Sequence, residues 1–513
     1  MELLGNLAYG FGVALTPLNL LMAALGVVLG TAIGAMPGLG SVNGVAILIP
    51  ITFAVPPTAG IIFLAAIYYG AMYGGAISSI TLNIPGASTA VATTFDGYPL
   101  AKKGRASQAL VAAAVSSFIG GTVSIILFTL FAPPLAEFAL KFGPAETFTL
   151  MLLAFATFAG LGGGNALKTI IATLLGLMFS TVGLDIVSGR PRMIFGDIPG
   201  FYHGINFLVL AIGLYGVGEI LSTAEERLVT GERVQAKVRL RDILFTIKEM
   251  VTFKRAFGIG SLLGFFVGML PAAGATPASF MSYSVVKRFS RNPESFGTGT
   301  IEGVIAPETA NNAASTGAML PMLTLGIPGS PTTAVMLGAL VIWGLLPGPM
   351  LFIEHREFVW GLIGSLYVAN VMAVLINLFA IPVFTMILWL PFTILAPLVI
   401  VVCAVGGYAP TFSVFDMVLV FVFGLAGYVF RKLDYPLAPM VLALVLGNGT
   451  EVSLRQSLIM SHGSIGIFFG FEGGAFTHPI AAALMYTSLI LYALPVVGAA
   501  IRYFRRRPEL AKA

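Results

Sequence analysis

Three long stretches of the chain contain no charged residue: 3–95, 309–353 and 358–415. Each is much longer than the ~20 apolar residues that an α-helix needs to cross a bilayer. Only 10% of the 513 residues are Asp, Glu, Lys or Arg, against about 25% in soluble proteins, so water cannot solvate the chain on all sides. Because a membrane segment must satisfy its own backbone hydrogen bonds, we predict an all-α polytopic membrane protein with roughly 10–12 transmembrane segments.

The composition also excludes several classes of function. The single Cys403 rules out a disulfide framework or a cysteine-based metal site. There is no phosphate-binding Gly-Lys-Ser/Thr loop, and no paired catalytic carboxylates, nucleophile elbow or metal-ligand spacing indicates an enzyme. The net charge of +5 is attributed to loops facing anionic lipid rather than to a nucleic-acid surface. We therefore expect no catalytic residues and no organic cofactor.

One motif occurs twice. Thr81-Leu-Asn-Ile-Pro-Gly86 returns as Thr324-Leu-Gly-Ile-Pro-Gly329, 243 positions later. A second pair precedes each copy: Gly34-Ala-Met-Pro-Gly-Leu-Gly40 and Gly268-Met-Leu-Pro-Ala-Ala-Gly274, 234 positions apart. The same two motifs in the same order indicate an internal duplication, which constrains the fold more than any single segment does.

Basic clusters predict which loops face the cytoplasm. Residues 223–255 hold eight basic and five acidic residues, and further basic clusters lie at 102–105, 287–291, 431–432 and 502–507. The positive-inside rule places all five clusters, and with them the C-terminus, in the cytoplasm. Nine candidate spans connect them consistently, at about 107–132, 147–163, 166–187, 203–222, 358–388, 392–409, 414–430, 436–450 and 478–503.

Residues 256–286 lie between two basic flanks and are too short for two full spans. Their middle, Pro271–Pro277, is rich in residues that helices tolerate badly. We expect a re-entrant hairpin here, and a matching hairpin at about 18–55 with its tip at Pro37–Asn43. Irregular backbone at membrane depth is tolerated only where protein buries it or where it lines a cavity.

The two halves are predicted to be inverted relative to each other. The segment after the first Ile-Pro-Gly ends in basic residues, whereas its counterpart after the second copy, Glu354–Glu357, is not basic and is expected outside. The first repeat would span residues 1–222 with its helix break at 84–86. A charged cytoplasmic linker would follow at 223–255, and the second repeat would span 256–513 with its break at 327–329. The placement of the first 17 residues stays open.

Interrupted apolar segments at matching positions of two inverted halves are typical of a secondary transporter's binding site. Pro is tolerated in a first helical turn, Gly permits close backbone approach, and free N–H groups at a helix N-terminus attract anions. Small residues also serve close helix packing, but duplication of the whole motif favours binding. The candidate substrate-binding residues are Asn43, Asn83, Pro85, Gly86, Ser88, Thr89, Thr276, Gly326, Pro328, Gly329, Ser330 and Thr332.

Carbonyl, hydroxyl and amide oxygens in the same regions suit a hard cation such as Na⁺. The candidate Na⁺ ligands are Gly38, Ser78, Asn311, Asn312 and Thr316. Glu308 opens a charge-free stretch, and two interpretations are left open. It is either a functional acid at membrane depth or a residue that flanks a helix start just after Pro307.

The motifs resemble those of the large membrane subunit of the bacterial tripartite tricarboxylate transporters, over nearly the whole chain. The matching segments are Gly34–Gly40, Tyr69-Gly-Ala-Met-Tyr-Gly-Gly75, Asn83-Ile-Pro-Gly86, Asp96-Gly-Tyr-Pro99, Ala306-Pro-Glu-Thr-Ala-Asn-Asn312 and Gly326-Ile-Pro-Gly329. The resemblance implies a cation-coupled importer of carboxylates such as citrate in the bacterial inner membrane. It also implies two partners: a small four-span membrane subunit and a periplasmic substrate-binding protein. Analogy with other binding-protein-dependent transporters adds an elevator-type movement of the halves.

The predicted function is thus the permease subunit of a binding-protein-dependent secondary transporter that imports di- or tricarboxylates with Na⁺. Proton coupling is the main alternative, and a channel or a membrane scaffold subunit is a further one. The carboxylate carried, the coupling stoichiometry and dimerisation of the complex are not determined by the sequence.

Overall fold

The computed structural model describes residues 2–36, 38–161, 165–185, 188–196, 198–225, 240–271, 273–380, 383–384, 392–409 and 411–510. Within these residues the chain is almost entirely helical. Eight helical segments are long and apolar enough to cross a membrane, and seven shorter helices are apolar. The prediction of an all-α polytopic membrane protein is confirmed. Residues 226–239 of the predicted 223–255 linker lie outside the described residues, as does Pro37 at the first hairpin tip.

The chain divides into two compact units. Unit 1 comprises residues 1–136, 208–270 and 274–429, and unit 2 comprises 137–207, 271–273 and 430–513. Each unit therefore draws on both halves of the sequence, so the compact units differ from the predicted sequence repeats.

Unit 1 contains the helices of both hairpins and both Ile-Pro-Gly breaks. Its first half supplies α1 (Glu2–Ala14), α2 (Pro17–Ala35), α3 (Gly40–Leu48), η1 (Ile49–Ala54), α4 (Pro57–Leu82), η2 (Ser88–Ala90), α5 (Val91–Leu100), the π-helical η3 (Ala101–Arg105) and most of α6 (Ala106–Ala139). Then come α9 (Phe207–Ala211), the π-helical η5 (Ile212–Val217), α10 (Gly218–Glu225), α11 (Leu240–Met250) and η6 (Val251–Phe253).

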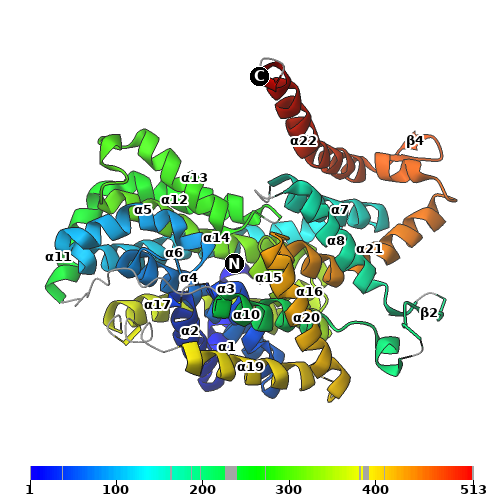
Figure 1. The fold of residues 1–513 in the computed structure, drawn as a ribbon, viewed down its shortest axis with the longest axis horizontal. Helices are drawn as coiled ribbons and strands as arrows, with labels where there is room; N and C mark the ends of the chain where they lie inside the picture. Colours follow the sequence, from blue (N-terminus) through cyan, green and yellow to red (C-terminus); the bar gives the residue numbers. More distant parts are fainter. Residues whose placement is uncertain are drawn as a thin grey trace. The chain divides into compact units, whose positions relative to one another are not determined.

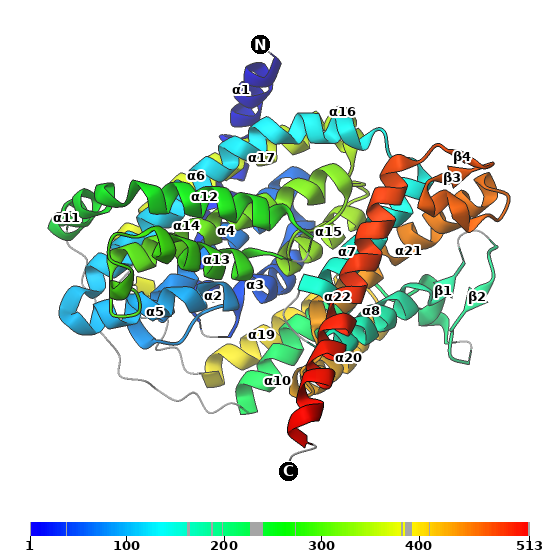
Figure 2. The same cartoon turned by 90° about the horizontal axis from the view of Figure 1, so that it is seen from above.

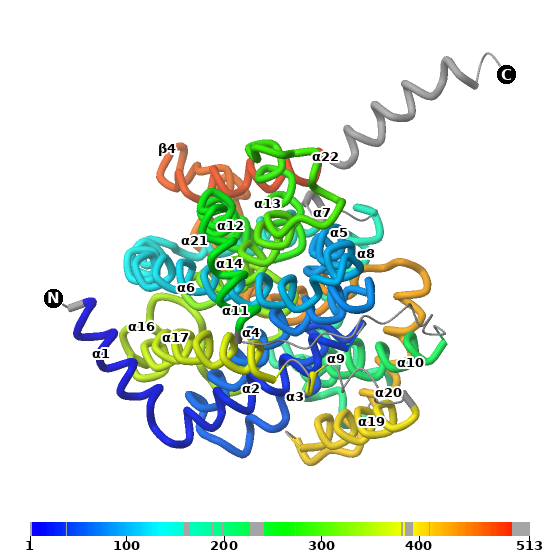
Figure 3. The backbone as a smooth tube through the Cα atoms, turned by 90° about the vertical axis from the view of Figure 1, so that its left-hand side faces the viewer, coloured from blue at the N-terminus to red at the C-terminus, as the bar shows by residue number. Residues whose placement is uncertain are grey.

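The second half supplies the remaining elements of unit 1. They are α12 (Lys254–Met269), α13 (Ala275–Phe289), η7 (Pro293–Ser295), α14 (Ile301–Leu325), α15 (Pro331–Ile342), α16 (Pro349–Glu354), α17 (Arg356–Phe379), α19 (Phe392–Tyr408) and most of α20 (Val414–Lys432). Figures 1 and 2 show α12, α13 and α14 side by side, and all three pack on one another. The N-terminal helix α1, whose placement was open, lies along α17 (Figure 3).

Unit 2 holds α7 (Pro144–Leu161), α8 (Ala166–Ser180), η4 (Pro199–His203), α21 (Leu437–Met460), η8 (Ile465–Phe469) and α22 (Pro479–Leu510). It also holds two short antiparallel pairs, β1 (Gly183–Leu184) with β2 (Pro191–Arg192), and β3 (Phe471–Glu472) with β4 (Ala475–Phe476). Helix α7 packs against α22 and α21, and α21 also packs against α8 (Figure 2).

Two of the predicted spans in unit 2 have the wrong length. The span expected at 166–187 ends at Ser180, because Gly183 adopts a φ of 108° and the chain turns into β1 and β2. The span expected at 436–450 continues as α21 to Met460. The added turns carry Glu451 and Arg455, which form an ion pair one helical turn apart.

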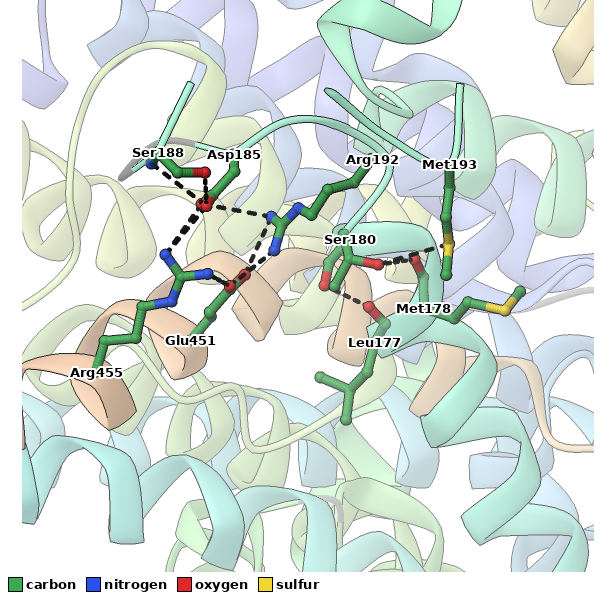
Figure 4. Close-up of polar contacts among 10 residues, drawn as sticks. Leu177, Met178, Ser180, Asp185, Ser188, Arg192, Met193, Glu451 and Arg455 are labelled. Carbon is green, nitrogen blue, oxygen red and sulfur yellow. Dashed lines mark hydrogen bonds and ion pairs between the residues drawn. The ribbon is translucent and has the colours of Figure 1, made fainter. Parts of the chain in front are cut away.

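Polar contacts in unit 2 join segments that the distribution of basic residues predicts to lie on the same side of the membrane. Arg192 in β2 and Glu451 in α21 form an ion pair at 2.8 Å, and Arg455 pairs with Asp185 at 3.1 Å (Figure 4). On the predicted cytoplasmic side, Lys168 Nζ donates to the Leu433 carbonyl at 2.6 Å. Each contact joins two segments that are predicted to lie on the same side, so the contacts agree with the predicted topology. Which side is cytoplasmic stays a prediction.

The duplication extends from the motifs into the packing of two helix pairs. Helix α2 lies against α4 through Gly30 and Gly34, and α12 lies against α14 through the equivalent Gly264 and Gly268. A Cβ atom at any of the four would come 2.2–2.5 Å from a partner carbonyl oxygen. The four carbonyls belong to residues related by the same 243-residue offset as the motifs: Ile67, Ala71, Ala310 and Ala314. The repeats thus share their residue-level packing, and their inversion stays a prediction.

Candidate functional site

The two Ile-Pro-Gly breaks have the same backbone conformation. Helix α4 ends at Asn83, with φ 58° and ψ 22°, and α14 ends at Gly326, with φ 71° and ψ 19°. Such left-handed residues terminate helices, and both Asn and Gly tolerate them. Four residues later the chain is extended at Ala87 (φ −146°, ψ 161°) and at Ser330 (φ −147°, ψ 162°), and the next helical segment begins.

The prolines of the breaks do not occupy a first helical turn. Pro85 and Pro328 lie in the non-helical segments between the left-handed residue and the next helix. The first-turn proline is Pro331, at the start of α15, where the missing N–H costs little. Ser330 caps that helix in a reciprocal arrangement with Thr333.

Both expected hairpins are pairs of helices joined by a short turn. Helix α2 is followed by α3, and α12 by α13, with the second helix beginning at or just after a left-handed glycine. Gly40 has a φ of 58° and Gly274 a φ of 64°, a backbone conformation that residues other than glycine rarely adopt. The glycine at each tip therefore lets the chain turn from the first helix of the hairpin into α3 or α13.

Four helical segments begin next to one another and form a closed cycle of contacts, which we call the N-terminal ring. Its members are the starts of α3, η2–α5, α13 and α15. Ser41 is hydrogen-bonded to Thr332 at 2.8 Å, which joins α3 to α15. Ser88 is hydrogen-bonded to Thr276 at 3.0 Å, which joins η2 to α13.

Two further contacts close the ring within each half. The N–H of Gly274 donates to the carbonyl of Gly329 at 3.0 Å. In the first half, a Cβ at Gly40 would lie 3.3 Å from the Cβ of Ala87. Each hairpin tip thus touches the break of its own half and hydrogen-bonds the other half. This reciprocity is what a two-fold relation between the halves produces.

The second break is more deeply buried than the first. Ser330 and Thr332 are 3% and 2% exposed, whereas Asn83 and Ser88 are both exposed. The hydroxyl of Tyr68 in α4 also reaches Ser330, at 3.0 Å. The other candidates in the two breaks, Pro85, Gly86, Thr89 and Pro328, adjoin these residues in sequence. The ring therefore gathers candidates from both halves.

Asn43 lies in α3 beside a carboxylate that the sequence reasoning missed. Its amide donates to Glu219 of α10 at 2.9 Å and more weakly to the carbonyl of Gly38 at 3.4 Å. Glu219 is only 5% exposed. The available signal was an acid inside an otherwise apolar predicted span. This geometry gives Asn43 a partner within the protein.

The five Na⁺ candidates are divided among several places. The carbonyl of Gly38 accepts a hydrogen bond from Asn43. Ser78 packs against Gly86, since a Cβ added at Gly86 would come 3.0 Å from the Ser78 hydroxyl. Thr316 is hydrogen-bonded to Tyr69. Asn311 and Asn312 lie on α14 next to Glu308 and are fully buried. The hydrogen bonds of these residues therefore do not gather all five candidates into one site.

Glu308 lies in the interior of α14 and not at its start. The helix begins at Ile301, and Glu302 occupies its first turn, so Glu308 is about two turns inside. It is fully buried, and its carboxylate accepts hydrogen bonds from Thr93 and from Ser117, the latter at 3.2 Å. The interpretation of Glu308 as a helix-start residue is wrong, and a buried acid remains.

Asp96 is a second buried acid, and its role is structural. It accepts hydrogen bonds from the N–H groups of Gly297, Gly299 and Thr300 at 2.8–3.0 Å and from the Tyr283 hydroxyl at 2.8 Å. The carboxylate therefore anchors the N-terminus of α14, where negative charge is favoured. The residue stands in the Asp96–Pro99 motif, which was the signal for it.

Comparison with known proteins gives one family. The family model described as "Tripartite tricarboxylate transporter TctA family" matches residues 20–442. An uncharacterized 52.8 kDa protein in the TAR-I ttuC' 3' region of Agrobacterium vitis is 39% identical over 492 residues, covering 95% of each chain. An uncharacterized protein in the TAR-II ttuC' 3' region of the same organism is 38% identical over 234 residues, 46% of this chain and 94% of the relative. No solved structure matches the chain significantly.

Proposed function

The chain belongs to the tripartite tricarboxylate transporter TctA family, and from this membership we propose that it imports a di- or tricarboxylate together with Na⁺. It is a multi-pass membrane transporter subunit. In the proposal, the N-terminal ring binds the carboxylate. A periplasmic binding protein delivers the substrate, and a small four-span subunit completes the complex in the bacterial inner membrane, with the C-terminus of this chain in the cytoplasm.

The observation that supports the proposal is the N-terminal ring. Each helix N-terminus carries a partial positive charge of roughly +0.5, so four of them supply roughly +2. That charge is close in magnitude, and opposite in sign, to the charge of an ionised dicarboxylate. The ring segments 38–43, 83–91, 274–277 and 326–335 contain no charged side chain. An anion would therefore be held by backbone dipoles and hydroxyl groups, and not by Lys or Arg.

The hydroxyl pairs give the ring two equivalent recognition points. Ser41 with Thr332 and Ser88 with Thr276 pair across the halves. Each hydroxyl can instead donate to a carboxylate oxygen, which makes a stronger, charge-assisted hydrogen bond. Binding would thus exchange a contact between neutral groups for one with the anion at each point.

Sodium is the coupling ion in this proposal. A carboxylate that enters an apolar interior with its charge unpaired is strongly disfavoured, and broken helices of transporters commonly combine anion-binding N-termini with a cation site. Uptake into vesicles that contain the complete transporter should therefore require a Na⁺ gradient. Equal uptake with choline in place of Na⁺ would refute Na⁺ coupling and leave proton coupling, and non-saturable transport without the binding protein would indicate a channel.

The binding site is tested with threonine variants of the purified full-length chain. Thr276→Val and Thr332→Val keep the side-chain shape and remove one hydroxyl of each pair. Losing a hydrogen bond to a charged group costs ~1.5–3 kcal/mol, so each variant should bind a dicarboxylate about tenfold or more weakly. Ligand-induced thermal stabilisation measures the affinity. Thr181→Val, a partly exposed position in unit 2, is the matched control. Unchanged stabilisation in both ring variants would refute the assignment.

A further inference from the structure

Glu308 is a buried carboxylate without a charged partner. It is 0% exposed, and its polar contacts include the hydroxyls of Thr93 in α5 and Ser117 in α6. Among the described residues, none of the ion pairs includes Glu308. Two neutral hydroxyls do not offset the cost of burying an ionised carboxylate. The site therefore requires a positive charge from a bound species.

Two buried amides beside this carboxylate have unused hydrogen-bonding capacity. Asn311 and Asn312 follow Glu308 by three and four residues, so all three side chains share one face of α14. Both are 0% exposed. Asn311 lies close to the carboxylate, yet neither its oxygen nor its nitrogen makes a hydrogen bond of good geometry. The side-chain oxygen of Asn312 also has no partner among the described residues.

We infer that Glu308, Asn311, Asn312, Thr93 and Ser117 form a Na⁺ site inside unit 1. Carboxylate, amide and hydroxyl oxygens are the ligands that hard cations prefer. A bound Na⁺ would neutralise Glu308 and also satisfy the amide oxygens. A proton would neutralise the acid, and the O–H of Glu308 could donate to Asn311, but the buried oxygen of Asn312 would stay unpaired at a cost of ~1–3 kcal/mol. This unpartnered oxygen therefore favours a metal cation over a proton.

The position of this site gives it a route to the N-terminal ring. Thr93 lies in α5, whose preceding turn η2 begins with Ser88 in the ring. Glu308 lies in α14, which ends at the second break before Ser330. A cation held between α5 and α14 would link the ring member α5 to the helix that leads through the second break into the ring member α15. This step rests on the proposed function, and it predicts that Na⁺ and carboxylate strengthen each other's binding, as linked sites must.

The site is tested by Na⁺ binding without any carboxylate. The full-length chain, purified in detergent, is titrated with NaCl against choline chloride at constant ionic strength, and its thermal unfolding is followed. A cation that binds the folded state raises the unfolding temperature. Glu308→Gln, which removes the charge and keeps the shape, should abolish the Na⁺-dependent shift. Glu302→Gln, in the first turn of the same helix, should retain it.

Asn311→Ala provides a second variant should Glu308→Gln fail to fold, and it should weaken Na⁺ binding by about tenfold or more. A full Na⁺ shift in either Glu308→Gln or Asn311→Ala would overturn the site. No Na⁺ shift in the native chain would also overturn it, including the case in which a proton alone occupies Glu308. If a dicarboxylate still stabilises that native chain, the proposed carboxylate site stands although the Na⁺ site falls.

Discussion

Alanine at Gly86 is expected to abolish carboxylate uptake while the chain still inserts into the membrane. The Cβ of this alanine would lie 1.9 Å from the carbonyl oxygen of Gly34 and 3.0 Å from the hydroxyl of Ser78. Ordinary van der Waals contact begins at 3.4 Å. The first break and α2 would therefore have to move apart by about 1.5 Å, because the closest obstacle is backbone and has no rotamer to change.

This displacement should affect transport more than stability. Overpacking in a close-packed interior typically costs ~1–3 kcal/mol, which a large membrane protein can survive. The break leads directly into Ser88 and the N-terminal ring. Misplacing a positioning group by ~1 Å can cost about a hundredfold in rate, so uptake should fall by roughly that factor. Gly329→Ala should behave alike, because its Cβ would meet the Gly268 carbonyl oxygen at 2.3 Å.

The assay is uptake of a radiolabelled dicarboxylate by vesicles that contain the complete transporter, normalised to the amount of chain in the membrane. Gly258→Ala is the matched control, since a Cβ added at this α12 glycine would have no neighbouring atom within 4 Å, and its φ is not positive. Uptake by Gly86→Ala within about twofold of the native rate would refute the reasoning. An equal loss in Gly258→Ala would show that these regions tolerate no added methyl group, whatever their contacts.

Two further predictions concern groups outside the ring. His478 lies just before α22, outside the membrane-spanning helices. Burial lowers the pKa of its imidazole, but the hydrogen bonds to Glu146 and Glu472 have a larger effect and raise this pKa above the usual 6.5. The stabilising effect of the charged imidazole is thus present below pH 6.5 and is lost as the pH rises through the raised pKa. We therefore expect His478→Gln to lower the unfolding temperature at pH 5.5–6 by more than at pH ~9. Equal losses at both pH values would contradict the role of charge. Asp96→Asn should destabilise the chain by ~2–4 kcal/mol, because it removes the charge that anchors the start of α14. Denaturant unfolding measures the change, with the exposed Glu294→Gln as control, and a similar small effect in both would contradict the anchoring role.

Properties that depend on local composition were predictable from the sequence. Long charge-free stretches imply membrane helices, because a bilayer span requires about 20 consecutive apolar residues whatever the rest of the fold is. The ends of the two long central helices were also predictable near Asn83 and Gly326, since Gly, Asn and Pro act on the backbone locally. The duplicated motifs indicated two equivalent hairpins, and the helix pairs α2–α3 and α12–α13 of both hairpins are present in unit 1.

The partners of individual side chains were decided by tertiary packing. Ser41 and Thr332 are 291 residues apart in sequence, and Thr93 and Glu308 are 215 apart. No local pattern specifies such pairs, because they depend on how helices from the two halves dock. For the same reason the sequence predicted both hairpin tips and both breaks, but not which side chains of the two halves would meet there. Asp96 and Glu308 show the difference most clearly, since both are fully buried acids. The first accepts hydrogen bonds from backbone N–H groups, whereas the second accepts them from hydroxyl groups and lies beside two amides with unused hydrogen-bonding capacity. The same chemical group therefore anchors a helix in one place, and in the other it is the proposed ligand of a cation.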